Sequence, residues 1–180
     1  DRFDAAWYAM GAAAHRGLGM LLKRGNGDDR YDASHSTSIG AAHDQSVAFF
    51  LDEGGDDRYR VGDLGVGAAH EGSIAVFVDV AGHDAYGVGA AACRALGAAP
   101  VSQLGPRREG LTNVGFFLDL GGDDAYPAHC GRARNDASWK TPRARPDLPP
   151  RSEAGAGIDG QFLAPFATMP QAAPPLRSPS

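Results

Sequence analysis

Six-residue apolar segments recur along the chain, and each ends in an aspartate. They read VAFFLD at residues 47–52, IAVFVD at 74–79 and VGFFLD at 114–119. Their β-branched and aromatic residues are typical of β-strands, and the second position of each is Ala or Gly. Apolar residues stand on both faces of each segment, which predicts strands that are buried on both sides.

A turn follows each predicted strand, and a tyrosine follows each turn. At residues 54–57 the turn reads GGDD, in which Gly accepts positive φ and Asp favours a side-chain-stabilised turn. We expect a second, shorter strand around each tyrosine. Tyr31, Tyr59 and Tyr86 follow one another at nearly equal intervals, whereas the interval from Tyr86 to Tyr126 is much longer. About a dozen extra residues are therefore expected within 91–106.

The repeat extends to the start of the chain. Residues 13–31 form a more divergent copy in which Arg24 takes the place of Asp52. Phe3 precedes Tyr31 by the same interval that separates Tyr31 from Tyr59. Because the sequence begins within a unit, we expect a longer array whose neighbouring repeats are partners of this segment. A truncated array with no independent function is the corresponding alternative.

A single unit, which is shorter than about 30 residues, holds too little apolar surface to fold alone, but stacked units bury a continuous core. The unit is shorter than a propeller blade and lacks the leucine pattern of leucine-rich repeats. The sequence therefore predicts an all-β fold, a β-solenoid of the parallel β-helix type with about four coils over residues 1–126. An α/β solenoid, with a helical turn at 5–14 or 40–45, is the alternative.

Composition changes after Tyr126. Ten of the 12 prolines lie in residues 127–180, and the formal charge changes from −8 in residues 1–126 to +3. Because proline fixes φ and lacks an N–H donor, we expect 127–180 to be a Pro-rich, mostly irregular tail, with apolar stretches at 158–163 and Phe166. The net charge of −5 gives no reason to expect a nucleic-acid partner, and no apolar run reaches the ~18 residues of a membrane span.

Aspartates at equivalent positions of the units are the main candidate site. In a stack of units, each column would place carboxylates ~5 Å apart, a spacing that favours a hard cation such as Ca²⁺. The candidate metal ligands are Asp52, Asp56, Asp57, Asp79, Asp84, Asp119, Asp123 and Asp124. The alternative is that each aspartate caps its own turn by accepting backbone N–H bonds and binds no metal.

Histidines form a second column. His15, His43 and His70 lie at the same short interval before Arg24, Asp52 and Asp79, respectively. Imidazoles can ligate Zn²⁺, but stacked side chains point the same way, so the column favours rings that bond to neighbouring carbonyls.

The aromatic column, Phe3, Tyr31, Tyr59, Tyr86 and Tyr126, predicts structural stacking, with an exposed sugar-binding face as the alternative. Cys93 and Cys130 allow either a disulfide or two free thiols.

The unit A-A-H-x-x-x-[VI]-A-x-F-[LV]-D-x-[GA]-G-x-D-x-Y, over residues 1–126, resembles tandem-repeat segments of uncharacterised bacterial proteins in which LLDxGGDDxY recurs. Its turns are also similar in part to the calcium-binding nonapeptide repeats of β-rolls. The resemblance brings no catalytic residues and implies a non-enzymatic structural or adhesive module, Ca²⁺-stabilised, that is secreted or on the cell surface. A carbohydrate-binding or polysaccharide-cleaving β-helix is the alternative, because paired carboxylates on a β-helix serve such chemistry.

Overall fold

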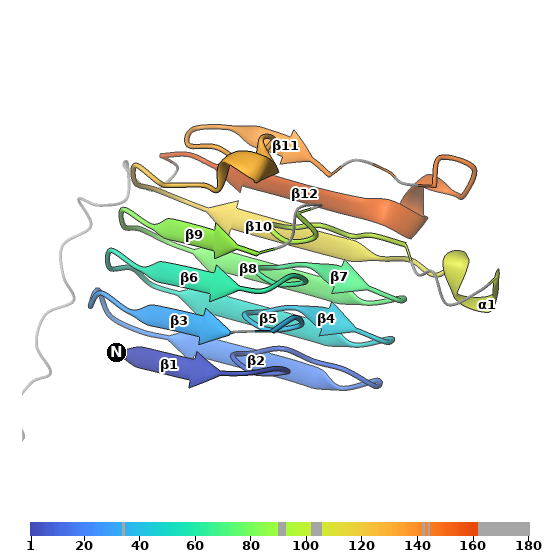
Figure 1. Ribbon diagram of the computed structural model, residues 1–180, viewed down its shortest axis with the longest axis horizontal. Coiled ribbons are helices and arrows are strands. Elements are labelled where there is room, and N and C mark those ends of the chain that lie inside the picture. Colours follow the sequence, from blue (N-terminus) through green and yellow to red (C-terminus); the bar gives the residue numbers. More distant parts are fainter. Residues whose placement is uncertain (34, 90–92, 102–105, 142, 144, 162–180) are drawn as a thin grey trace, which may run out of the picture.

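The computed structural model describes residues 1–33, 35–89, 93–101, 106–141, 143 and 145–161 (Figure 1). The strands within them are β1 (Arg2–Ala5), β2 (Leu18–Lys23), β3 (Arg30–Ala33), β4 (Ala42–His43), β5 (Val47–Asp52), β6 (Arg58–Val61), β7 (Ala69–His70), β8 (Ile74–Asp79), β9 (Ala85–Val88), β10 (Val114–Asp119), β11 (Ser138–Lys140) and β12 (Ala154–Asp159). The helical elements are α1 (Pro106–Glu109) and the 3₁₀ turns Ala128–Cys130 and Pro150–Glu153.

Three sheets hold these strands. β1, β3, β6 and β9 form a parallel four-stranded sheet, and β4 pairs with β7 in parallel. The six-stranded sheet has the order β11-β12-β10-β8-β5-β2, in which only the β11–β12 pair is antiparallel. Strands of one repeat unit thus pair with their equivalents in the next unit, and the units lie in layers (Figure 1). The prediction of an all-β fold is confirmed, and its sheets are mainly parallel.

The predicted strands at 47–52 and 74–79 coincide with β5 and β8, and the shorter strands expected around the tyrosines are β3, β6 and β9. The alternative with helical turns is wrong. Residues 40–45 contain β4, and residues 5–14 contain bends and a bridge from Ala13 to Ala42.

Two predictions about register are corrected. Lys23 rather than Arg24 pairs with Asp52, because the first unit is longer by a single position between its strand and its second turn aspartate, Asp29. The insertion also extends beyond 91–106. Gly65 and Ala95, which form a bridge, are separated in the sequence by little more than the length of an ordinary unit. The paired strands β8 and β10 are separated by a much longer stretch of sequence. Most of the added residues therefore follow Ala95, in a segment that includes α1.

The irregular structure expected after Tyr126 is wrong for residues 154–159. β12 extends the six-stranded sheet in register with β10, and β11 closes that edge. The β12 sequence AGAGID leaves room for Trp139 of β11, since a Cβ on Gly157 would lie 2.1 Å from the indole ring. Residues 162–180, which include the rest of the apolar stretch and Phe166, lie outside the described residues.

Stacked aromatic rings form the core between the two larger sheets. In the phenylalanine column, the ring centroid of Phe77 lies 5.0 Å from that of Phe50 and 5.3 Å from that of Phe117. In the tyrosine column, the ring centroid of Tyr59 lies 5.0 Å from that of Tyr31 and 5.1 Å from that of Tyr86. The two columns meet edge to face. These rings are buried, so the tyrosine column is structural and is not the exposed aromatic face that the sugar-binding alternative needs.

Glycine is required where one turn stacks on the next. Gly82 has a φ of 150°, and a Cβ there would lie 1.8 Å from the carbonyl oxygen of Gly55. At Gly122 the φ is 145° and the corresponding distance to the carbonyl oxygen of Gly82 is 1.5 Å. Any larger residue would push the layers apart, which explains the glycines of the GGDD turns.

A disulfide joins Cys93 to Cys130 and decides between the two alternatives for these cysteines. Near it, the indole N–H of Trp139 donates to the carbonyl oxygen of Leu96. The chain after Tyr126 is therefore attached to the segment between β9 and β10 by a covalent bond and by a buried side chain.

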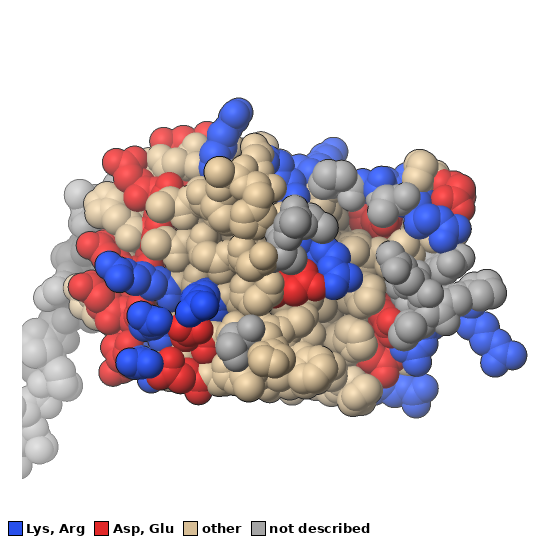
Figure 2. Space-filling view, in the orientation of Figure 1, with Lys and Arg blue, Asp and Glu red and all other residues tan. Residues whose placement is uncertain are grey.

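The outward faces of the two larger sheets differ. Charged side chains lie over β1, β3 and β6 (Figure 2), where Arg30 and Arg60 both pair with Asp32. The outward positions of the five parallel strands of the six-stranded sheet are apolar, and the most exposed are Leu18, Met20, Leu22, Val47, Ile74, Phe116 and Ile158. On the antiparallel edge strand β11, the exposed residues are Ser138 and Lys140. The predicted burial on both sides is therefore wrong for this sheet, whose outer face is open in the part of the chain that the structure describes.

Candidate metal centre

The last residue of each long strand after β2 is a buried aspartate that faces the interior. We call Asp52, Asp79, Asp119 and Asp159 the strand-end aspartates; their exposure is 0, 0, 0 and 3%. Each accepts a hydrogen bond from the tyrosine hydroxyl of the preceding layer. The bond from Tyr86 to Asp119 measures 2.7 Å. These bonds join successive layers from the inside.

A second buried column lies at the turns. We call Asp29, Asp57, Asp84 and Asp124 the turn aspartates. Asp57 accepts a bond from the backbone N–H of Asp29, Asp84 from that of Asp57, and Asp124 from that of Asp84, each at 2.7 Å. Asn135 ends the series by accepting from the N–H of Asp124. The turn aspartates thus cap the turn of the neighbouring layer rather than their own.

Two of the predicted ligands, Asp56 and Asp123, lie on the exposed side of the turns, apart from the buried groups. Asp56 accepts a bond from the N–H of His83, and the Nδ1 atom of His83 accepts one from the N–H of Asp123. His83 therefore replaces an aspartate as an acceptor, which requires its proton on Nε2.

The two buried columns approach each other closely enough to hold a cation. In three groups the carboxylate oxygens lie within 4.8 Å of one another: Asp29, Asp52 and Asp57; Asp57, Asp79 and Asp84; and Asp84, Asp119 and Asp124. Buried oxygens of Asp79, Asp84 and Asp124 have no hydrogen-bond partner. Six of the eight predicted ligands belong to these groups. Asp29, which the sequence pattern did not single out, completes the first group.

Burial strongly disfavours the charged form of these carboxyl groups. It raises the pKa of Asp57 and Asp119 to about 7, of Asp84 to about 8 and of Asp79 to about 10. The negative charges of neighbouring aspartates act in the same direction. Without a cation, several of these groups therefore hold a proton at neutral pH.

The first pair of this series differs at both partners of the tyrosine–aspartate bond. Phe3 stands in the tyrosine column and has no hydroxyl, and Lys23 stands in the strand-end column. The Lys23 ammonium pairs with Asp29 at 2.6 Å. Although burial opposes its ionisation, Asp29 has a lowered pKa because of this contact. A lysine thus balances the acidic columns at this end.

The histidine column is only partly formed. His43 and His70 pair across β4 and β7, but His15 lies one position out of register and contacts Asp44 instead, 2.9 Å away. The one-position shift of the first unit explains this difference.

A surface groove of about 350 Å³ lies over the edges of Tyr59, Tyr86 and Tyr126, beside Arg58. The described residues that line it include no carboxylate, and glycoside hydrolysis uses a pair of them.

No protein-family model, curated protein or solved structure matches this chain. Within the described residues, every helix is too short or too polar to cross a membrane. Function is therefore inferred from the geometry alone.

Replacing Tyr59 with Phe tests the bond between layers. The change leaves a buried oxygen of Asp79 without its donor, and we expect the free energy of unfolding to fall by about 1–3 kcal/mol. Chemical denaturation measures the change. Tyr8→Phe is the control because Tyr8 is 41% exposed, and equal stability of the two variants would contradict the assigned bond.

The raised pKa values also predict how stability depends on pH. A carboxyl group whose pKa is higher in the folded state stabilises the fold at low pH, and this stabilisation is lost as pH rises through the folded-state value. In EGTA, the free energy of unfolding should fall by at least about 2 kcal/mol from about pH 5 to about pH 9. Asp84→Asn, which keeps the Oδ1 acceptor, should weaken this dependence. Stability that is constant or rises over this range would count against neutral buried acids.

Proposed function

We propose that this chain is a non-enzymatic structural or adhesive repeat module, a β-solenoid that binds a second copy of itself through the outer face of the six-stranded sheet. The in-register pairing of equivalent strands supports the solenoid, since each unit contributes one strand to each larger sheet. The observation that carries the function is the continuous apolar surface that the five parallel strands present on that outer face.

Fifteen outward positions on five parallel strands contain neither a charged nor a polar side chain. They are Leu18, Met20 and Leu22; Val47, Phe49 and Leu51; Ile74, Val76 and Val78; Val114, Phe116 and Leu118; and Ala154, Ala156 and Ile158. Monomeric proteins rarely expose contiguous apolar patches larger than a few hundred Å², and larger patches mark interaction sites.

The size of the face suits a second copy. Five strands ~4.8 Å apart and six residues at ~3.3 Å each span about 480 Å², so two facing copies bury roughly 1,000 Å², the lower limit of specific interfaces. Two copies related by a twofold axis bring identical apolar faces together, as sheets do when they pack face to face.

The disulfide between Cys93 and Cys130 supports a secreted or cell-surface location as part of this proposal. Disulfides persist mainly in oxidising compartments.

Substituting Lys at Ile74 and Phe116 tests the face. Both side chains are more than 40% exposed, so the monomer should keep its fold while self-association weakens at least tenfold, because facing lysines would repel and lose their water. Sedimentation over a concentration series measures the change. Lys at the exposed positions Asn26 and His129 adds the same charge elsewhere and should leave association unchanged. A wild-type chain that stays monomeric throughout the series would contradict the proposal.

A second proposal concerns Ca²⁺, and the unpartnered oxygens of Asp79, Asp84 and Asp124 favour it. Ca²⁺ would replace the protons of the buried acids, so its effect should be larger at about pH 8 than at about pH 5. At 100 times its dissociation constant, it should add about 2.7 kcal/mol to the free energy of unfolding relative to EGTA.

Thermal melts in Ca²⁺ and in EGTA measure this effect. Asp84→Asn should reduce it, whereas Asp56→Asn on the exposed side should retain it. If Ca²⁺ leaves the melting temperature unchanged at both pH values, protons alone neutralise the columns.

A further inference from the structure

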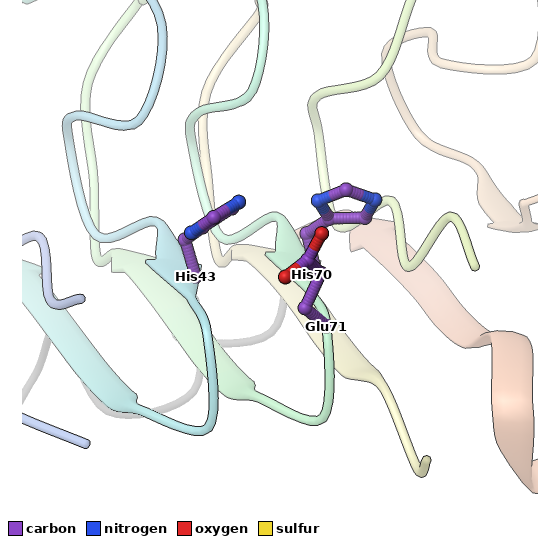
Figure 3. A group of neighbouring side chains, drawn as sticks. All are labelled: His43, His70 and Glu71. Atoms are coloured by element: carbon purple, nitrogen blue, oxygen red, sulfur yellow. The ribbon is translucent and has the colours of Figure 1, made fainter. Parts of the chain in front are cut away.

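A mixed cluster of nitrogen and oxygen donors lies at the ends of β4 and β7, apart from the acidic columns (Figure 3). His43 and His70 are register partners, and their ring centroids lie 5.4 Å apart with a tilt of 42°. The rings are therefore not stacked in parallel, as a simple ladder would require.

The backbone brings a third donor to the same place. Successive side chains of an extended strand point to opposite faces, but β7 ends at His70, and Glu71 has a left-handed φ of 56°. The alternation is interrupted, and the Glu71 carboxylate lies beside the ring of His70 (Figure 3). Donor atoms of His43, His70 and Glu71 all lie within 4.8 Å of one another.

The surroundings hold these donors in a state suited to a metal ion. The Nδ1 atom of His43 is buried and has no hydrogen-bond partner. The ring of His70 hydrogen-bonds the backbone of Val101. Metal-binding histidines commonly use one ring nitrogen for the metal and the other for such a bond.

Arg108, the third residue of α1, orients the carboxylate. Its guanidinium donates to Glu71 and, at 2.7 Å, to Asp44. One positive charge is thus shared between two carboxylates, which leaves a net negative charge beside the imidazoles. Glu71 is 1% exposed, so its position is fixed by packing as well as by this ion pair.

We propose that His43, His70 and Glu71 bind a zinc ion. Two imidazoles and one carboxylate are a donor set that suits Zn²⁺, whereas all-oxygen groups such as the aspartate columns suit Ca²⁺. A tetrahedral zinc with ligands at ~2.1 Å sets donor atoms about 3.4 Å apart, so small side-chain rotations convert the observed cluster into a site. The three protein ligands leave one position for water.

Zinc titration of the tag-free chain, after treatment with EDTA and dialysis, tests the proposal. Calorimetry should show one high-affinity equivalent, and Co²⁺ in place of Zn²⁺ should give the intense visible absorption of a tetrahedral site. His43→Ala and His70→Ala should each weaken zinc binding at least tenfold. His15→Ala removes an exposed histidine of the neighbouring layer and should bind as the wild type does.

Circular dichroism of the zinc-free variants comes first, and His43→Gln replaces His43→Ala if the alanine variant does not fold. Asp84→Asn separates this site from the aspartate columns, because it should leave zinc binding unchanged. The proposal is overturned if the wild type binds no zinc, if folded His43 and His70 variants bind as the wild type does, or if Asp84→Asn weakens binding as much as they do.

Discussion

The hydrogen bond from each tyrosine to the strand-end aspartate of the next layer is the constraint on which the structure depends. A carboxyl group buried among aromatic rings is costly unless it is neutral or well hydrogen-bonded. The tyrosine hydroxyl meets this need only when the layers are in register, since a slip by one residue would turn the aspartate to the outer face. Apolar stacking supplies attraction between layers, and the buried tyrosine–aspartate pairs select one alignment of them.

The same constraint explains the unusual first pair of the series. Where the tyrosine is replaced by Phe3, the aspartate is replaced by Lys23, so neither partner is left buried without the other. Lys23 then contacts Asp29 and places a positive charge at the end of two acidic columns. The buried acids are neutral when protonated, and Lys23 supplies a positive charge. Together these two effects let carboxyl groups accumulate along the interior without uncompensated charge. The buried acids thus lie inside the stack, while the five parallel strands of the six-stranded sheet carry an apolar outer face in the described residues.

Much of the fold could be predicted from the chain because each unit repeats both its apolar pattern and its turn. β5 and β8 follow directly from their β-branched and aromatic residues, and the GGDD turns follow from glycine and aspartate. β12 could not be recognised, because its alternating small residues carry no strand signal until Trp139 covers them. The tyrosine–aspartate bonds were also out of reach, since their partners are far apart in the sequence and meet only through the offset of one layer.

The remaining differences at the candidate sites have local causes. One additional residue in the first turn moved His15 and Arg24 out of register, and a left-handed φ at Glu71 brought in a carboxylate that no strand pattern predicts beside the histidines. The protonation state of the buried aspartates tests the central claim most directly. ¹³C NMR of the carboxyl carbons in metal-free protein, titrated from about pH 4 to about pH 10, reports it for each residue. We expect Asp79 and Asp84 to keep their protons well above pH 6. Titration of both groups near the ordinary aspartate value of about 4 would contradict this expectation.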